Sequence, residues 1–129
     1  MKKINEIVAV VLVVISTIGI IFGIFTIEKL RKSRLYTVEL IAREPNHGNW
    51  YPRKFKVPYG KKVRILIRNI ETVSHGFALP DFNVGVSEIK AGEVAVVEFI
   101  ADKKGVFPFM CTIWCSERHM EMTGEIVVE

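Results

Sequence analysis

The stretch VFPFMCTIWCSERHMEMTGEIVVE, residues 106–129, contains two apolar runs on either side of a cysteine-rich connection. The runs VFPFM (106–110) and EIVVE (125–129) are rich in Val, Ile and Phe, which are typical of β-strands. The connection holds both cysteines of the chain, a histidine and a methionine in the spacing C-x3-C-x3-H-x2-M: Cys111, Cys115, His119 and Met122. The stretch therefore predicts two strands joined by a loop whose side chains can bind a metal.

The same strand pattern continues upstream, back to Leu35. Residues 36–42 and 62–69 alternate apolar and polar side chains, which is the period of a half-buried strand. The segment KFKVP (54–58) ends in proline and is expected to be an edge strand or the end of a strand. Turn signals recur about every 8–12 residues and predict an all-β domain, a β-sandwich or a small barrel. The turn signals are YGK (59–61), AGE (91–93) and DKKG (102–105). The last two lie on either side of the apolar run VAVVEFI (94–100).

Residues 7–27, IVAVVLVVISTIGIIFGIFTI, contain no charged side chain. A helix of this length, at about 1.5 Å per residue, spans roughly the 30 Å of a bilayer core. The run is longer than the apolar part of a cleaved secretory signal and ends in EKLRK (28–32), so we expect an uncleaved anchor. The sequence thus predicts a transmembrane anchor with charged flanks over 1–34 and a second domain over 35–129.

The formal net charge of +4 belongs to the anchor region. Residues 1–34 hold six Lys and Arg against two Glu, whereas residues 35–129 hold twelve of each sign. This distribution fits lipid headgroups at the helix ends and gives no phosphate-binding face, so no nucleic-acid partner is predicted. By the positive-inside rule alone, the basic residues after the apolar run slightly favour a cytoplasmic C-terminal domain over the two lysines before it. Those residues are Lys29, Arg31, Lys32 and Arg34.

Three chemistries explain part of the cysteine-rich connection. A disulfide between Cys111 and Cys115 would close a tight loop and would leave the histidine and the methionine unexplained. A structural zinc site would take both cysteines, His119 and a distant His75, and would leave the thioether unused. A nucleophilic cysteine beside a histidine would explain one cysteine only, and no orienting carboxylate or oxyanion-hole motif accompanies it in the sequence.

Copper uses all of these side chains, because thiolate, imidazole and thioether are the ligands that it favours in electron-transfer proteins. One thiolate would serve a single copper ion, whereas two thiolates could bridge two copper ions with one histidine on each. The second histidine would then be His75, in NIETVSHGF (69–77), which we expect in a loop at the end of the strand predicted over 62–69. His47, in the turn EPNHGN, is expected to be an ordinary surface or hydrogen-bonded histidine.

Three segments carry a resemblance to a known family: SHGF (74–77), CTIWCSERHMEM (111–122) and TGEIVVE (123–129). They resemble the dinuclear copper A (CuA) domain of subunit II of haem–copper cytochrome c oxidases and the C-terminal CuA domain of nitrous-oxide reductase. The resemblance covers essentially all of residues 35–129. HMEMTG is closer to the reductase version, whereas the membrane anchor is more like an oxidase subunit. The resemblance implies a cupredoxin-like fold, a Greek-key β-sandwich, preceded here by a single N-terminal transmembrane helix.

The resemblance also implies the ligands of two copper ions. Two thiolates would bridge the ions, one imidazole would bind each ion, and a thioether and a backbone carbonyl would be weak ligands on opposite sides. In that order, the ligands would be Cys111 and Cys115, His75 and His119, Met122, and the carbonyl of Ile113.

The residues around such a centre carry further expectations. Four aromatic side chains are expected to form a dry apolar surround, although ordinary core packing explains them equally well: Phe77, Phe107, Phe109 and Trp114. Trp114 could instead be exposed at a docking surface. Met120 matches no ligand position and is expected to be a packing residue. Trp50 and Tyr51 are a candidate point of electron uptake.

By the same resemblance, the protein would be subunit II of a membrane terminal oxidase, an electron-transfer subunit that is not catalytic alone. It would take electrons from a cytochrome c or a small blue-copper protein and pass them to haem in subunit I. It would cross the cytoplasmic membrane once, with the copper domain on the extracytoplasmic side, a placement that we favour over the small Lys/Arg asymmetry. The alternatives are a stand-alone, membrane-tethered CuA carrier for another reductase, such as a nitrous-oxide reductase system, and a copper-delivery protein.

Overall fold

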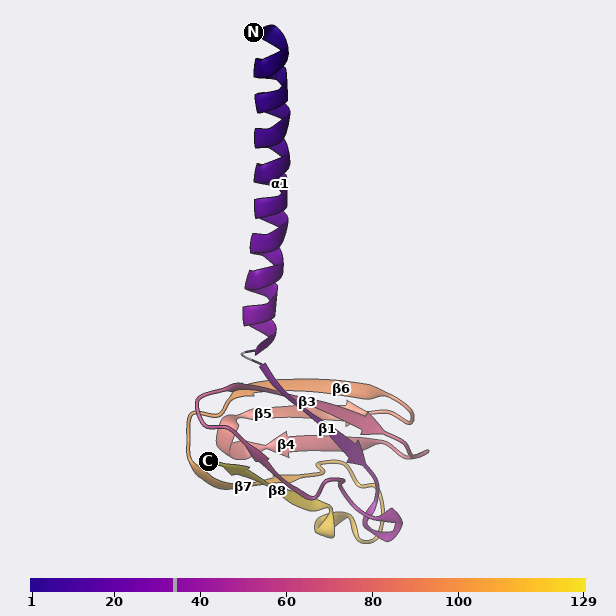
Figure 1. The fold of residues 1–129 in the computed structure, drawn as a ribbon. Helices are drawn as coiled ribbons and strands as arrows, with labels where there is room; N and C mark the ends of the chain where they lie inside the picture. The colour runs from indigo at the N-terminus through magenta and orange to yellow at the C-terminus, as the bar shows by residue number, and fades with distance from the viewer. Residues whose placement is uncertain (34) are drawn as a thin grey trace. The chain divides into compact units, whose positions relative to one another are not determined.

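The computed structural model of the chain describes residues 1–33 and 35–129. Arg34, the last residue of the predicted anchor and one of its basic residues, lies outside the described residues. The chain divides into two compact units, Met1–Arg34 and Leu35–Glu129, which are described separately below. The first contains helix α1 (Lys2–Ser33), and the second is built from strands (Figure 1).

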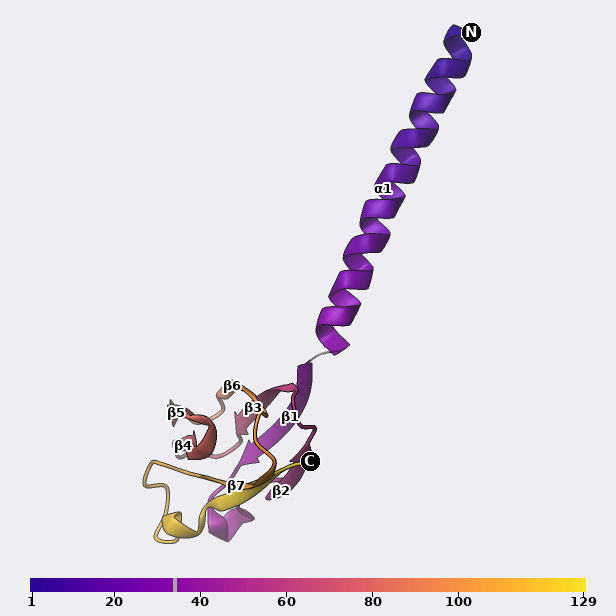
Figure 2. The same ribbon diagram turned by 90° about the vertical axis from the view of Figure 1, so that its left-hand side faces the viewer.

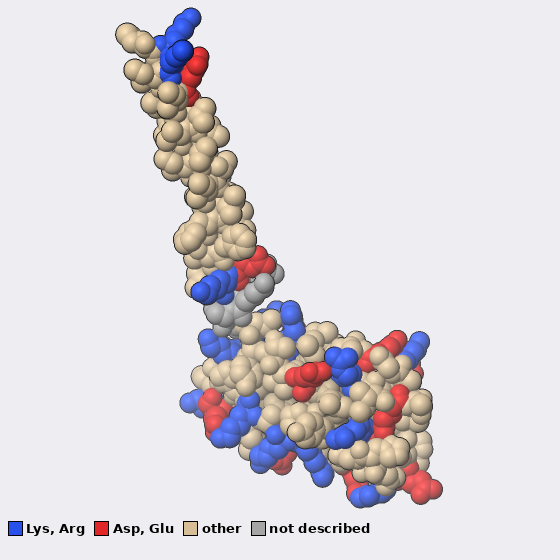
Figure 3. Space-filling view, turned by 45° about the vertical axis from the view of Figure 1, so that its right-hand side comes forward, with Lys and Arg blue, Asp and Glu red and all other residues tan. Residues whose placement is uncertain are grey.

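Helix α1 has the composition of a helix in an apolar environment. Its segment Lys2–Leu30 is long and apolar enough to cross a membrane, and a signal sequence meets the same criteria. In Figure 3 the helix has charged side chains near its two ends and none between them. Polar groups in lipid must find their hydrogen-bond partners within the segment. The side-chain hydroxyls of this helix find theirs in its own backbone carbonyls. Ser16 and Thr26 donate hydrogen bonds to the carbonyls of Val13 and Phe22, each over 2.8 Å.

The β domain consists of two mixed sheets, seen from two sides in Figures 1 and 2. One sheet has the strand order β1-β3-β6, and the other has the order β2-β8-β7-β4-β5. The pairs β1–β3 and β2–β8 are parallel, and the other pairs are antiparallel. The strands are β1 (Leu35–Ala42), β2 (Lys54–Val57), β3 (Lys62–Asn69), β4 (His75–Leu79), β5 (Val84–Ile89), β6 (Val94–Ile100), β7 (Gly105–Met110) and β8 (Thr123–Val128), with short 3-10 turns η1 (Pro45–His47), η2 (Pro80–Phe82) and η3 (His119–Glu121).

The strands predicted from alternation are present. In β3, Val63, Ile65 and Ile67 are fully buried, and Arg64 and Leu66 between them are partly exposed. The predicted edge strand is also present, because β2 lies at one edge of its sheet and ends before Pro58. The all-β prediction with an N-terminal helix is therefore confirmed, and the alternation was readable because β3 buries only one of its faces.

The prediction that His75 lies in a loop was wrong, because His75 is the first residue of β4. This strand lies between β7 and β5, and four of its five residues are buried. A short strand buried on both faces shows no alternation of apolar and polar residues, so its sequence carries no period-2 signal. The position of His75 at the start of a central strand fixes its backbone more firmly than a loop would.

The core beside this strand is aromatic. Trp50, Phe77 and Phe109 are almost completely buried, and the ring centroid of Trp50 lies 5.9 Å from that of Phe77 and 5.7 Å from that of Phe109. Both Trp50 pairs are edge-to-face, an arrangement that aromatic rings prefer. The expectation that Phe77 and Phe109 are buried is confirmed. Phe77 lies in β4, which begins at His75, and Phe109 lies in β7, which leads to the cysteine-rich loop.

Gly124 allows two chain segments to approach closely beside Phe109. A Cβ atom at this position would lie 2.6 Å from the carbonyl oxygen of Arg53 and 2.3 Å from the ring of Phe109. We therefore expect Gly124→Ala to lower the free energy of unfolding of the β domain by about 1–3 kcal/mol, the usual cost of overpacking. Urea unfolding of the full chain, followed by tryptophan fluorescence, measures this change. Glu125→Ala, at an exposed neighbour, is the control, and equal stability of the two variants would contradict the prediction.

Candidate metal centre

The cysteine-rich loop is the connection of an antiparallel hairpin. Strands β7 and β8 pair up to Met110 and Thr123, so the loop begins at Cys111 and ends at Met122. The backbone N–H of Cys111 donates to the carbonyl of Met122 over 3.0 Å, which closes the loop at its base. The same carbonyl accepts a hydrogen bond from the buried indole of Trp50 over 3.1 Å. The hairpin and Trp50 together fix the two ends of the loop.

His75 reaches this loop through the pairing of β4 with β7. The strands are antiparallel with Ala78 opposite Met110, so the residues before Ala78 run alongside those after Met110. Gly76 makes the approach close, because a Cβ atom there would lie 2.0 Å from Oγ1 of Thr112. The N–H of Gly76 donates to Sγ of Cys111 over 3.4 Å. Sheet pairing thus places His75 beside a cysteine 36 residues further along the chain.

The predicted ligand atoms lie together at this end of the β domain. Nδ1 of His75 lies 3.9 Å from Sγ of Cys111, and the carbonyl oxygen of Ile113 lies 3.3 Å from the same sulfur. Nδ1 of His119 lies 3.6 Å from Sγ of Cys115, and Sδ of Met122 lies 3.6 Å from that sulfur. Each thiol therefore has one imidazole and one weak donor beside it.

Two thiols and one imidazole form the tightest group. The ligand atoms of His75, Cys111 and Cys115 all lie within 4.8 Å of one another, and the three residues are buried. Among the described residues this is the one group of His, Cys, Asp and Glu that meets this limit, and His119 is not part of it. Both cysteines are free thiols, so the alternative of a disulfide between them does not describe this structure.

The two thiols have different acidities. Burial raises the pKa of Cys111, but hydrogen bonds with His75 and with the backbone of Gly76 and Ile113 outweigh burial and bring the pKa below its ordinary value. Burial and the neighbouring Cys111 raise the pKa of Cys115 to about 11. The pair therefore favours one negative charge over two, and a bound cation would favour loss of the second proton.

A carboxylate adjoins the imidazole of His75. Nε2 of His75 lies 2.8 Å from Oε2 of Glu71, while Nδ1 faces Cys111. Burial lowers the pKa of His75, but its contacts with Cys111 and Glu71 outweigh burial and raise the pKa above its ordinary value. Burial likewise raises the pKa of Glu71, and hydrogen bonds from the Glu44 N–H, His47 and His75 bring it below the ordinary value. The imidazole and the carboxylate stabilise each other's charged forms.

Sequence reasoning missed Glu71, and it also missed Asn69, whose side chain forms hydrogen bonds with the segment that precedes His75. The amide of Asn69 is buried, and it donates to the carbonyls of Val73 and Ile89 over 2.7 and 2.9 Å while accepting from the N–H of Glu71. Asn69 therefore shapes the segment that carries Glu71 and His75. An asparagine at the end of the predicted strand 62–69 was the available signal, but its burial and its partners are set by the fold.

The exposed fractions of the surrounding side chains decide between the expectations for them. Trp114 is 70% exposed, so it is no part of a buried surround and has the exposed position that was its alternative. Met120 is 81% exposed, so the prediction that it is a packing residue was wrong. Both lie in the aperiodic loop, where sequence spacing gives no direction for a side chain. Trp50 is 1% exposed and cannot receive an electron at the surface, whereas Tyr51 is 61% exposed. Phe107 is half-buried and contacts Phe82 with a centroid distance of 4.9 Å.

Known proteins share this fold and part of this sequence. The family model of the cupredoxin-like domain matches residues 17–128. The chain belongs to the cupredoxin-like domain family. Cupredoxin sites bind copper through thiolate, imidazole and weak axial ligands, and the donors gathered at this end of the chain fit that metal.

Relatives of this cupredoxin-like chain include nitrous-oxide reductases. The protein of Cupriavidus necator is 37% identical over 102 residues, which are 77% of this chain and 15% of the relative. The protein of Ralstonia nicotianae is 35% identical over 103 residues, again 15% of the relative. The chain therefore spans about 15% of the length of these curated relatives.

Among solved structures, this cupredoxin-like chain is similar to the periplasmic domain of subunit II of cytochrome oxidase of Bradyrhizobium japonicum. The identity is 25% with a TM-score of 0.58, over 73% of this chain and 83% of the other. A heme-copper terminal oxidase dimer is similar at 29% identity and a TM-score of 0.59, over 73% of this chain and 65% of the other. The predicted cupredoxin fold is confirmed.

Proposed function

We propose that the chain holds a dinuclear copper centre of the CuA type and transfers single electrons through it. The observation that carries this proposal is the arrangement of the two thiols, which adjoin each other while each has a different imidazole beside it. The proposed ligands are those expected from the sequence: His75, Cys111, the carbonyl of Ile113, Cys115, His119 and Met122.

The geometry favours two metal ions over one tetrahedral zinc ion. Four ligands at zinc bond lengths of about 2.0–2.3 Å must lie within roughly 4 Å of one another. His119 stays outside the group whose ligand atoms lie within 4.8 Å, although it adjoins Cys115. Two copper ions held by both thiolates would make use of both imidazoles. It also gives a use to the thioether of Met122, which zinc does not need.

Bound copper would supply a one-electron redox couple. The chain's own contribution is to hold the donors in place and to keep water away. His75 and Met122 are fully buried, and Cys111 and Cys115 are 6% and 8% exposed. Three of the donors, His75, Cys111 and Met122, lie at the ends of β4, β7 and β8, whose pairing resists movement. Little would rearrange around a change of charge, which favours fast electron transfer.

Copper loading of the full chain in detergent tests the centre. We expect two copper ions per chain and an EPR spectrum split by two equivalent copper nuclei. Splitting by one nucleus would reduce the protein to a mononuclear cupredoxin. A site that takes Cu(I) without colour or a reversible couple would favour the copper-delivery alternative, and a preference for zinc would favour the structural one.

We further propose that the chain is subunit II of a membrane cytochrome c oxidase, which passes electrons from a cytochrome c or a small blue-copper protein to haem in subunit I. The likeness to a periplasmic oxidase domain and the membrane-compatible helix α1 support this role. The likeness to nitrous-oxide reductases supports the alternative of a tethered carrier for another reductase. If the chain co-purifies from native membranes with a haem-containing subunit, the oxidase role is favoured. If no such subunit co-purifies, the role of a tethered carrier is favoured.

The exposed Trp114 suggests where an electron donor docks. It is 70% exposed, yet its ring lies 6.0 Å from the ring of His119, so a partner that contacts Trp114 comes close to the centre. We expect Trp114→Ala to weaken binding of a reduced donor by roughly tenfold, as for an aromatic anchor of an interface. Stopped-flow oxidation of a cytochrome c over a concentration series measures the change. Tyr59→Ala, at an exposed aromatic residue before β3, is the control, and equal rates for the two variants would contradict the prediction.

The proposed orientation places the β domain outside the cytoplasm, with α1 as a single membrane span. A phosphatase reporter, which is active only after export, is fused to the C-terminus, and a reporter active only in the cytoplasm is fused to a matched chain. We expect activity from the first fusion alone. Activity from the second alone would show that the Lys/Arg asymmetry decides the topology.

A further inference from the structure

The carboxylate of Glu71 lies behind the proposed copper ligand His75. We infer that Glu71 is a positioning residue of the metal centre: it holds the imidazole so that Nδ1 faces Cys111, and His47 in turn holds the carboxylate. This inference rests on the proposed copper centre and extends it to two residues that touch no metal ligand sulfur.

The contact with His75 determines which ring nitrogen is available. An imidazole whose Nε2–H donates to a carboxylate presents the lone pair of Nδ1 on the other side of the ring. In this structure Nε2 lies 2.8 Å from Oε2 of Glu71, and Nδ1 lies 3.9 Å from Sγ of Cys111. The side chain of His75 is 0% exposed and that of Glu71 is 10% exposed, so water does not replace this contact. Glu71 therefore fixes both the tautomer and the orientation of the ring.

The carboxylate of Glu71 is itself held from several sides. Its Oε2 accepts a hydrogen bond from the backbone N–H of Glu44 over 2.7 Å, and its Oε1 lies 2.5 Å from Nδ1 of His47. The backbone N–H of Glu71 donates to the side chain of Asn69 over 2.9 Å. A side chain with this many fixed partners has one position, so it can impose one position on His75.

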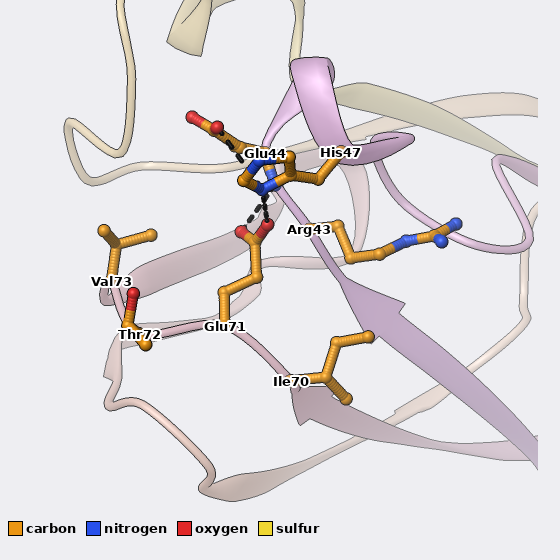
Figure 4. Close-up of a pocket in the computed structure, with 7 residues that line it drawn as sticks. All are labelled: Arg43, Glu44, His47, Ile70, Glu71, Thr72 and Val73. Atoms are coloured by element: carbon orange, nitrogen blue, oxygen red, sulfur yellow. Dashed lines mark hydrogen bonds and ion pairs between the residues drawn. The ribbon is translucent and has the colours of Figure 1, made fainter.

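His47, one of the residues that hold the carboxylate of Glu71, is exposed at the surface. His47 has a side chain that is 65% exposed, and it lies within an open pocket of about 390 Å³ next to turn η1. Figure 4 shows the side chains of His47, Glu44 and Glu71 meeting at one point, with the carboxylate of Glu71 directed at the ring of His47. Turn η1 thus contributes to the proposed metal centre although none of its residues is a proposed ligand.

The charge of Glu71 gives a second, separable effect. A negative charge beside a metal ligand raises the ligand's basicity and favours the more positive, oxidised form of the centre. Removal of the charge alone should therefore raise the reduction potential. Removal of the whole side chain should in addition free the ring of His75 to turn, which weakens metal binding.

The experiment compares Glu71→Gln, Glu71→Ala and His47→Ala in the full chain in detergent. Glu88→Gln is the matched control, because Glu88 accepts a hydrogen bond from Ser74, next to His75, without contacting the imidazole. Three quantities are measured: copper affinity by competition with a chelator, reduction potential by titration, and the ring tautomer of His75 by nitrogen NMR before copper is added.

We expect Glu71→Ala to weaken copper binding by about 10- to 100-fold, the usual effect of removing such a partner, and to change the ring tautomer. Glu71→Gln should keep most of the affinity, because its amide oxygen still accepts from Nε2, but should raise the potential. His47→Ala should act in the same direction as Glu71→Ala with a smaller effect, because the N–H of Glu44 still holds the carboxylate. If Glu71→Ala does not fold, the reduction potential of Glu71→Gln tests the inference instead.

Wild-type affinity, potential and tautomer in both Glu71 variants would overturn the inference while the copper centre stands. A shift of the reduction potential in Glu88→Gln as large as that in Glu71→Gln would overturn it as well, because any nearby carboxylate would then have the same effect. If the wild-type chain binds no copper pair, the proposed function fails. In that case a changed His75 tautomer in Glu71→Ala still supports the positioning role, and an unchanged tautomer overturns it.

Discussion

Replacing Cys115 with serine is expected to remove the two-copper EPR signature from the loaded protein and to lower the copper content below two ions per chain. Cys115 has His119 and Met122 beside it and lies in the same group as Cys111 and His75. A serine hydroxyl at this position does not provide the soft thiolate that copper favours, so the bridge between two ions is lost.

The fold should survive this substitution. Serine is close to cysteine in size, and the β domain holds together through its core rather than through a disulfide. Circular dichroism of Cys115→Ser should therefore match that of the wild type. Met120→Leu is the matched control: it removes a sulfur atom from the same loop, but from a side chain that is 81% exposed. A two-nucleus splitting that persists in Cys115→Ser would contradict the bridging role.

Replacing Phe109 with alanine is expected to destabilise the β domain more than Gly124→Ala does. Phe109 is 0% exposed, and its ring lies within 5.8 Å of the rings of Trp50, Phe55 and Phe77. Truncation of a buried phenylalanine to alanine costs about 3–5 kcal/mol, because apolar contacts are lost and a cavity remains. A domain of this kind has a total stability of about 5–15 kcal/mol, so much of it would disappear.

Urea unfolding of the full chain in detergent, followed by near-UV circular dichroism, measures this loss. Val106→Ala in the same strand is the control, because Val106 is 53% exposed and should change the free energy of unfolding little. Equal unfolding midpoints for the two variants would contradict the expected packing. Since Phe109 lies two residues before Cys111, we also expect Phe109→Ala to broaden the EPR spectrum of the copper-loaded protein.

Periodicity made most of the strands readable from the sequence. In β3 the buried residues alternate with outward ones, and the edge position of β2 is marked by Pro58. The hairpin loop 111–122 was also readable, because its donors are close in sequence and the two flanking runs pair directly. Where one face of a strand is buried, or where residues are near neighbours, local sequence is sufficient.

The strand β4 was not readable in the same way. It is buried on both faces and is only five residues long, so its sequence has no alternation. The pairing of Ala78 with Met110 then brings His75 to the loop from a distant part of the chain. The sequence identified His75 as a candidate ligand, but the reason that it reaches Cys111 is a sheet register.

The side chains around the centre depended on the fold still more. Trp114 and Met120 are apolar but exposed, and Trp50 is buried although it follows a polar turn. In a loop without regular structure, the direction of a side chain is set by hydrogen bonds and packing with other segments. The contacts of Glu71 with Glu44 and His47 are of this kind, since they join residues 24 or more positions apart.

The sequence alone determined the apolar N-terminal helix, the β domain and the types of donor atom available, because these follow from composition, period and short spacings. The tertiary structure decided which imidazole adjoins which thiol, which carboxylate holds His75, and which aromatic rings face water. Those properties depend on strand register and on side-chain direction across long sequence separations, and neither can be predicted from a single local stretch of sequence.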